Sequence, residues 1–212
     1  MAKPVTLAHF LFCPSEPATA AHPSLHLVRK LAIHCKAHYP HAPGQFISRH
    51  LYLQLCWQTI YAYCYWHTSK QNAHNPMQLQ LKINGAYSRG FNLSGAPILS
   101  KAEQNTALIE FFSCVGKWIN TDYALGKKEQ GRLLIDTLNS AFERAHSLNL
   151  ASADHTTHCH QQLHNLISNH VNLNTPFKLT ADRLTCCRYY LAGYKKCQTC
   201  PKKDIKTNEH TS

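Results

Sequence analysis

Four cysteines lie within fifteen residues near the C-terminal end of the sequence. Cys186 and Cys187 are adjacent, and Cys197 and Cys200 form a C-x-x-C that is followed directly by Pro201. Four thiolates can hold a tetrahedral zinc ion, to which a C-x-x-C supplies two ligands from one turn. The same four can hold a [2Fe–2S] cluster, with two ligands for each iron. The sequence therefore predicts a metal or iron–sulfur site.

The adjacent pair helps to distinguish between these sites. Zinc knuckles normally place two or more residues between their sulfurs, whereas nothing separates Cys186 from Cys187. Because neighbouring side chains diverge, bringing both sulfurs to one small ion strains the backbone. The spacing thus favours a [2Fe–2S] cluster, and it leaves zinc and plain thiols, reduced or oxidised, as alternatives.

The segment CCRYYLAGYKKCQTCP resembles the C-terminal signature of the FhuF-like ferric-siderophore reductases. In that family a double cysteine, a segment with an aromatic residue and a glycine, and a final C-x-x-C-P bind a [2Fe–2S] cluster. Nine residues separate the double cysteine from the C-x-x-C here, one fewer than in the family pattern. The resemblance implies one-electron reduction of Fe(III) in hydroxamate siderophores, with Cys186, Cys187, Cys197 and Cys200 as cluster ligands.

Side chains near the motif, and in a segment far ahead of it, are candidates for substrate binding. Arg188 and Tyr189 follow the double cysteine, and the segment KINGAYSRGF supplies Lys82, Tyr87 and Arg89. Their simpler interpretation is packing and solvated charge. Two other functions also remain open: a [2Fe–2S] electron carrier or redox sensor without siderophore specificity, and a zinc-binding nucleic-acid or interaction protein.

The charge of the chain indicates an acidic partner. Lys and Arg number 22 against 11 Asp and Glu, a formal charge of +11, and such a surface attracts acidic molecules. No nucleic-acid partner is expected, because no recognition-helix or RNA-binding signature accompanies the charge. Lys195, Lys196, Lys202 and Lys203 flank the C-x-x-C in sequence. We therefore expect an acidic electron donor, such as a ferredoxin, to dock there.

The sequence predicts no transmembrane segment, because it contains no run of eighteen apolar residues. The N-terminal apolar stretch is interrupted by His9 and Pro14, which favours mature protein over a signal peptide. A cytoplasmic location, or a peripheral one at the inner membrane, is expected, and thiols stay reduced there. The six other cysteines have no close partner in sequence and are interpreted as small buried residues: Cys13, Cys35, Cys56, Cys64, Cys114 and Cys159.

Helical periodicity and turn signals predict the elements that must position these residues. Leu27, Leu31 and Cys35 indicate a helix over 24–38. Residues 45–67 are apolar and aromatic on nearly every face, which is typical of a central helix. Alternating apolar residues on both sides of Asn84-Gly85 predict a β-hairpin.

Three more helices are expected beyond the hairpin. Ser100 and Glu103 form a capping box before the first, and Asp154 is expected to cap the third. Residues 127–131 are interpreted as a linker. The third helix places His160 and His164 one turn apart, a geometry that can bind a metal, but no carboxylate has matching spacing.

The expected fold is mainly α (α+β), a helical body with one β-hairpin and a C-terminal [2Fe–2S] cysteine module. The predicted organisation is a reductase body at residues 1–178, the cluster-binding module at 179–203 and a polar tail at 204–212. Residues 1–23, with four prolines, are expected to be irregular. The tail is expected to be disordered.

Overall fold

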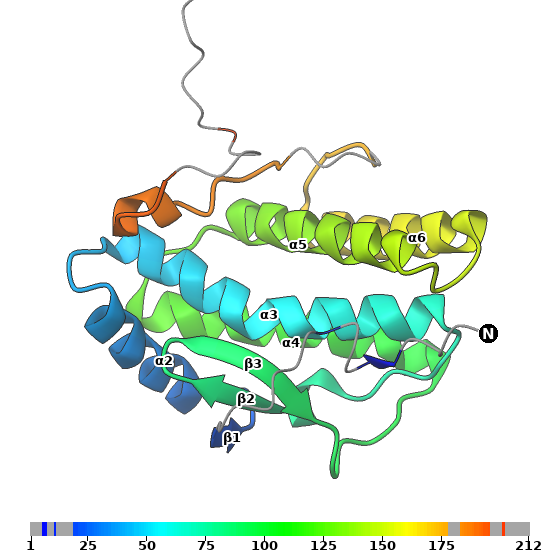
Figure 1. Ribbon diagram of the computed structural model, residues 1–212, viewed down its shortest axis with the longest axis horizontal. Helices are drawn as coiled ribbons and strands as arrows, with labels where there is room; N and C mark the ends of the chain where they lie inside the picture. The colour runs from blue at the N-terminus through cyan, green and yellow to red at the C-terminus, as the bar shows by residue number, and fades with distance from the viewer. Residues whose placement is uncertain (1–5, 8–10, 12–18, 178–182, 196–200, 202–212) are drawn as a thin grey trace, which may run out of the picture.

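The computed structural model describes residues 6–7, 11, 19–177, 183–195 and 201. Five α-helices and a three-stranded antiparallel sheet make up most of these residues (Figure 1), which confirms a mainly α fold with a small β part. The helices are α2 (Leu25–His38), α3 (Gly44–Thr68), α4 (Lys101–Asp122), α5 (Lys127–Ser147) and α6 (Ala153–Val171). The strands are β1 (Thr19–Ala21), β2 (Gln80–Asn84) and β3 (Tyr87–Asn92), and two short 3₁₀ helices are η1 (Pro76–Gln78) and η2 (Tyr189–Ala192).

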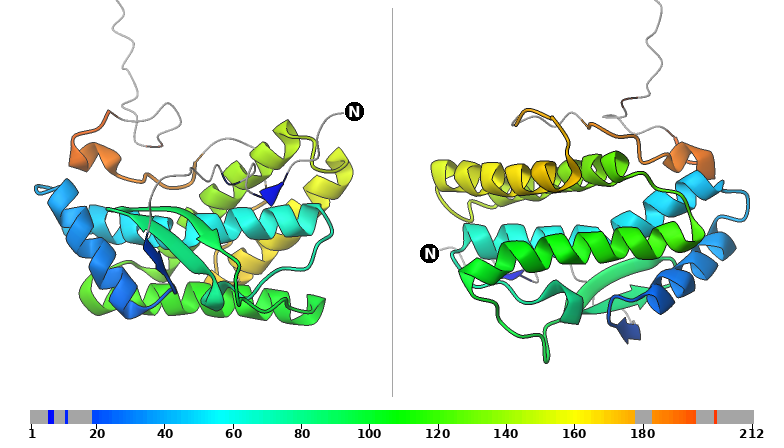
Figure 2. Two further views of the ribbon diagram at one scale, coloured as in Figure 1. Left: turned by 60° about the horizontal axis from the view of Figure 1, so that its bottom comes forward. Right: turned by 180° about the vertical axis from the view of Figure 1, so that it is seen from behind.

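Helix α3 lies at the centre of three layers. Helices α5 and α6 run side by side above it, α4 lies beside it, and α2 and the sheet lie below, as Figures 1 and 2 show from several sides. Phe46, Tyr52 and Tyr63 of α3 are fully buried. A helix surrounded in this way has no polar face, and the expectation of a central helix is confirmed.

The predicted capping box of Ser100 and Glu103 is confirmed, and Ser24, the first residue of a predicted helix, is also an N-cap. The Ser24 hydroxyl accepts the Leu27 N–H at 3.2 Å, and the Glu103 carboxylate accepts the Ser100 backbone N–H at 2.9 Å. The predicted cap Asp154 is wrong. Ser152 caps α6 instead, with its hydroxyl facing the His155 N–H at 3.4 Å, because α6 begins one residue before Asp154.

The predicted linker at residues 127–131 is also wrong, because these residues form the first turn of α5. Tertiary contacts hold them in the helix. Glu129 forms an ion pair with Arg49 of α3, and the Gln130 side-chain amide donates to the Leu125 carbonyl at 2.8 Å. Gly131 lies directly against Val171 of α6. The connection between α4 and α5 is therefore only residues 123–126.

The predicted hairpin is confirmed, and a third strand extends it. Strands β2 and β3 turn at Gly85, whose φ of 56° is a conformation that glycine adopts without strain. Leu81 and Ile83 point into the core. Within the segment expected to be irregular, Thr19–Ala21 pairs antiparallel with β2. Three residues are too few to show an alternating pattern, so β1 could not be identified from sequence.

Residues 183–195 of the predicted C-terminal module pack on the body. They cross α5 and lie over the N-terminal end of α3 (orange in Figure 1). Residues 178–182, 196–200 and 202–212, which include the whole of the proposed tail, lie outside the described residues. Among the helices that the structure describes, none has the length and apolarity needed to cross a bilayer.

Candidate functional site

Asp136 in the middle of α5 anchors the chain immediately before the double cysteine. One carboxylate oxygen accepts the backbone N–H of Leu184 at 2.7 Å, and the other accepts that of Thr185 at 2.9 Å. Burial raises the pKa of Asp136 to about 6, although both N–H groups act to lower it. Two charge-assisted bonds to adjacent amides fix both the position and the direction of the backbone that enters Cys186.

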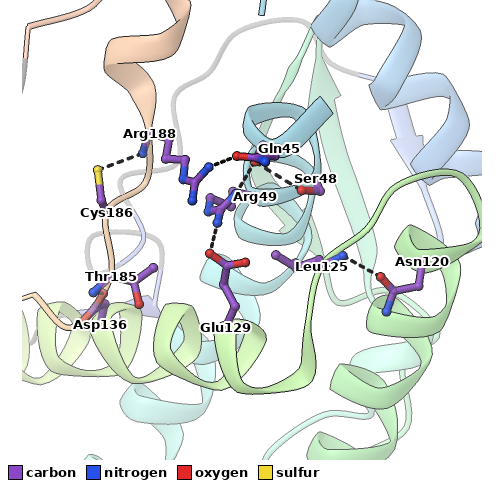
Figure 3. A network of polar contacts seen from close by, with 10 residues as sticks. All are labelled: Gln45, Ser48, Arg49, Asn120, Leu125, Glu129, Asp136, Thr185, Cys186 and Arg188. Carbon is purple, nitrogen blue, oxygen red and sulfur yellow. Dashed lines mark hydrogen bonds and ion pairs between the residues drawn. The ribbon is translucent and has the colours of Figure 1, made fainter. Parts of the chain in front are cut away.

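The backbone reverses just after the double cysteine. Arg188 has a φ of 60°, which is uncommon for a residue with a side chain, and its N–H donates to the Cys186 sulfur at 3.4 Å. The Arg183 guanidinium donates to the Cys187 sulfur at 3.9 Å. Figure 3 shows the Cys186 contact between α5 and the start of α3. Both sulfurs of the adjacent pair thus accept a hydrogen bond from an N–H donor of the same segment.

The two described cysteines of the motif differ in exposure. Cys186 is 8% exposed, and Cys187 is half-buried. Cys197 and Cys200 lie outside the described residues. In the part of the chain that the structure describes, no group of three or more His, Cys, Asp or Glu side chains has the geometry of a metal site, and this part holds only half of the predicted ligand set.

Four of the six cysteines outside the motif are buried thiols that are unsuited to metal binding. Burial raises the pKa of Cys35 to about 11, and it also raises the pKa values of Cys56, Cys64 and Cys159. Their thiols therefore stay protonated at neutral pH, as expected for small buried residues. Cys114 is half-buried, and Cys13 lies outside the described residues.

The histidine pair that the sequence places one turn apart in α6 consists of core residues. His160 and His164 are 3% and 2% exposed. The His160 ring stacks on Phe142 with 4.5 Å between centroids, and its Nε2 lies 2.8 Å from the Asn139 side-chain oxygen. Packing and this hydrogen bond through Nε2 hold His160 in the core, and no third ligand joins the pair among the described residues.

Tyr189, a predicted substrate contact, bonds to a buried histidine. The Nε2 of His50 lies 2.8 Å from the Ala86 carbonyl, so this nitrogen carries the proton. Nδ1 then accepts the Tyr189 hydroxyl at 2.8 Å. Burial lowers the pKa of His50, which keeps the ring neutral and the arrangement intact. Tyr189 thereby ties η2 to α3.

Tyr87, from the predicted hairpin, reaches the same place. Its hydroxyl hydrogen-bonds to that of Tyr39, which also lies 3.4 Å from the Tyr194 hydroxyl. The Tyr87 ring is 5.4 Å from that of His50. Tyr39, His50, Tyr87, Tyr189 and Tyr194 form what we call the tyrosine cluster, which joins the end of α2, the start of α3, the hairpin and η2.

The remaining predicted substrate contacts are dispersed. Arg188 reaches the start of α3, where its guanidinium donates to the Gln45 side chain. Arg89 is exposed and lies over the Tyr87 ring at 5.4 Å. Lys82 sits between buried Leu81 and Ile83 in β2, so its side chain leaves the opposite face of the sheet. The structure thus brings Tyr87, Tyr189 and Arg188 toward one region, and Lys82 is directed elsewhere.

A cavity of about 190 Å³ opens beside Cys187. Trp57 and Tyr61 of α3 form its aromatic wall, Asp136 lies on the α5 side, and Arg183 completes the rim. Its volume is below the roughly 300–1,000 Å³ of pockets that enclose a drug-sized ligand. The cavity can therefore admit only part of a larger molecule to the Cys187 sulfur.

Arg49 gives a test of whether these residues suit an anionic cofactor. Its side chain is only 4% exposed, and its Nε has no hydrogen-bond partner among the described residues. A Cys186 thiolate acts on Arg49 electrostatically. A buried cation with a spare donor, linked through Gln45 to the arginine that follows Cys187, fits a group that brings negative charge, so the residues fit a thiolate-ligated cluster.

Sequence reasoning missed Arg49, His50 and Asp136. One signal was present, because an adjacent Arg and His interrupt an otherwise apolar and aromatic helix, and polar groups at such positions need buried partners. No comparable signal marks Asp136. Comparison of the chain with family models, with curated proteins and with solved structures gave no match.

Proposed function

We propose that the protein is a ferric-siderophore reductase that works through a [2Fe–2S] cluster. The observation that carries the proposal is the adjacent pair Cys186-Cys187, held by Asp136 with N–H donors at both sulfurs. Adjacent cysteines suit two ligands of a two-iron cluster better than they suit a single zinc ion. The resemblance of the motif to the FhuF-like reductases adds the reaction and the substrate class, hydroxamate siderophores.

Cys186, Cys187, Cys197 and Cys200 would hold the cluster, which supplies single electrons when bound. Siderophores bind Fe(III) through hard oxygen atoms, and Fe(II) binds the same oxygens far more weakly. One electron therefore converts a nearly irreversible complex into one that releases iron. Electron transfer requires close approach and no proton-transfer residue, so the chain has to bring the chelate near the sulfurs.

The surroundings of Cys187 provide for that approach. The cavity admits one edge of a chelate, with the aromatic rings of Trp57 and Tyr61 as its wall. Leu184 and Tyr194, at the two ends of the segment around the cysteines, are 40% and 48% exposed. Exposed apolar side chains of this kind can pack against the hydrocarbon arms of a siderophore.

The proposed electron donor is a small acidic protein such as a ferredoxin, and the proposed location is the cytoplasm. A surface of +11 raises the rate of encounter with an acidic protein more than it raises affinity. Lys195 is exposed at the end of the described segment. Lys196, Lys202 and Lys203 lie outside the described residues.

Single-turnover kinetics test the proposal. The pre-reduced protein is mixed anaerobically with a ferric tris-hydroxamate or with an inorganic one-electron oxidant of the same potential. We expect faster oxidation by the siderophore and a higher yield when a ferrous chelator removes the product. Replacement of Trp57 by alanine should slow only the siderophore reaction. Equal rates with both oxidants would identify a plain electron carrier instead.

A further inference from the structure

Arg49 is a buried cation that the body of the protein compensates incompletely. One terminal nitrogen donates to the Gln45 carbonyl at 2.5 Å, and the other forms an ion pair with Glu129. Nε has no partner among the described residues. The Glu129 side chain is 32% exposed, against 4% for Arg49, so solvent screens the carboxylate more than it screens the guanidinium. The ion pair therefore leaves part of the buried charge unbalanced.

A second guanidinium increases this surplus. Arg188, which directly follows Cys187, donates to the side-chain oxygen of Gln45, and the same glutamine accepts from Arg49 through its backbone (Figure 3). Burial lowers the pKa of Arg49, the charge of Arg188 lowers it further, and a Cys186 thiolate raises it. Two guanidinium groups thus share Gln45, and Glu129 pairs with Arg49 alone.

The start of α3 adds positive potential at the same place. Its N-cap, Pro43, makes no side-chain hydrogen bond, and its first turn contains no acidic residue. The N-terminus of a helix carries roughly half a positive charge, and α3 has 25 residues. Arg49 lies in the second turn of this helix, so the cations and the helix terminus act together.

A cluster held by four thiolates would supply the missing negative charge. Its formal charge is about −2 when oxidised and about −3 when reduced, because one electron enters and no proton accompanies it. Positive charge nearby stabilises the more negative form more strongly. Net charge is one of the main determinants of the potential of an iron–sulfur site.

We propose that Arg49, assisted by Arg188, raises the reduction potential of the cluster and that Glu129 limits this effect. The inference rests on the proposed [2Fe–2S] function. Arg49 acts on the cluster through space, as a tuning residue, and makes no contact with the substrate. The electron comes from the one-electron acidic donor proposed above.

Redox titration of the anaerobically purified, cluster-loaded protein tests this assignment, because two variants should shift the midpoint potential in opposite directions. Arg49→Gln should lower the midpoint potential by about 59 mV, which is tenfold in the one-electron equilibrium. Glu129→Gln should raise the potential, because it removes the screening carboxylate. Arg29→Gln is the matched control, since it removes an equal charge from an exposed ion pair with Asp122 on the surface, and it should leave the potential unchanged.

A general disturbance of the fold would move Arg49→Gln and Glu129→Gln in the same direction, and that result would overturn the inference. If Arg49→Gln does not fold, Arg188→Gln decides, because the Arg188 side chain is only partly buried. This variant should lower the midpoint potential by an amount that changes the one-electron equilibrium constant about threefold. An unchanged potential would refute the assignment. Equal potentials with intact clusters would refute this inference alone. A native protein without iron and sulfide would refute the proposed function as well.

Discussion

The carboxylate of Asp136 should control the order of the segment that carries Cys186. Asp136→Asn keeps the size of the side chain and removes its charge. An asparagine has one acceptor oxygen and one NH₂ group, so it can accept the N–H of Leu184 or that of Thr185, but not both. The remaining backbone N–H then faces the NH₂ group of the asparagine, so two donors meet.

The two hydrogen bonds of 2.7 and 2.9 Å set the expected loss of local stability in Asp136→Asn. A hydrogen bond to a charged group contributes about 1.5–3 kcal/mol, so losing one and weakening the other costs about 2–4 kcal/mol locally. Removing a carboxylate whose pKa is raised by burial to about 6 recovers part of this through lower desolvation. A net loss of about 1–3 kcal/mol corresponds to roughly 5-fold to 150-fold in the opening equilibrium of the segment.

Amide hydrogen exchange of the cluster-free protein measures this opening at single residues. The amides of Leu184 and Thr185 should exchange roughly 5-fold to 150-fold faster in Asp136→Asn, while the amides of α3 and α4 keep their native rates. Asp122→Asn is the matched control, because its carboxylate forms an exposed ion pair with Arg29. Exchange at both amides within twofold of the native rate would refute the anchoring role of Asp136.

Two further predictions concern stability. Burial lowers the pKa of His160 to about 4, below roughly 6.5 in the unfolded chain, so its contribution to the free energy of unfolding is complete above pH 6.5 and is lost as the pH falls toward 4. Urea unfolding should therefore show about 2 kcal/mol less stability from this residue at pH 4.5 than at pH 7. His160→Phe should remove that part of the pH dependence of stability, and an unchanged pH dependence would be the contrary result. Gly131→Ala places a methyl group against Val171, with 3.0 Å between the two Cβ atoms, and should lower the free energy of unfolding by about 1–3 kcal/mol. Thermal unfolding should show a lower Tm for this variant than for Gly126→Ala, whose added methyl group meets open space. Equal Tm values would contradict the packing argument.

Most of the fold could be predicted from local sequence signals. Periodic apolar residues identified the helices, Ser24 and Ser100 marked two of their starts, and Gly85 marked the hairpin turn. The failures occurred where tertiary contacts decide. Glu129 and Gly131 belong to a polar, charged stretch that is typical of a linker, but an ion pair to α3 and close packing on α6 make it helical.

The candidate site was only half visible in the sequence. Adjacent cysteines are a local pattern, so Cys186 and Cys187 could be identified directly. Their supports come from distant parts of the chain: Asp136 lies 48 and 49 residues before the amides that it binds, and His50 lies 139 residues before Tyr189. Nothing in a single sequence indicates such pairs, because they depend on how α3 and α5 pack.

The cofactor is the central claim, and the metal and sulfide content of anaerobically purified protein tests it most directly. We expect a red-brown protein with about two irons and two acid-labile sulfides per chain. Cys186→Ser and Cys187→Ser should lose or destabilise the cluster, and Cys159→Ser, at a buried thiol outside the motif, should retain it. A colourless protein with one tightly bound zinc ion per chain, or a normal cluster in Cys187→Ser, would contradict the account.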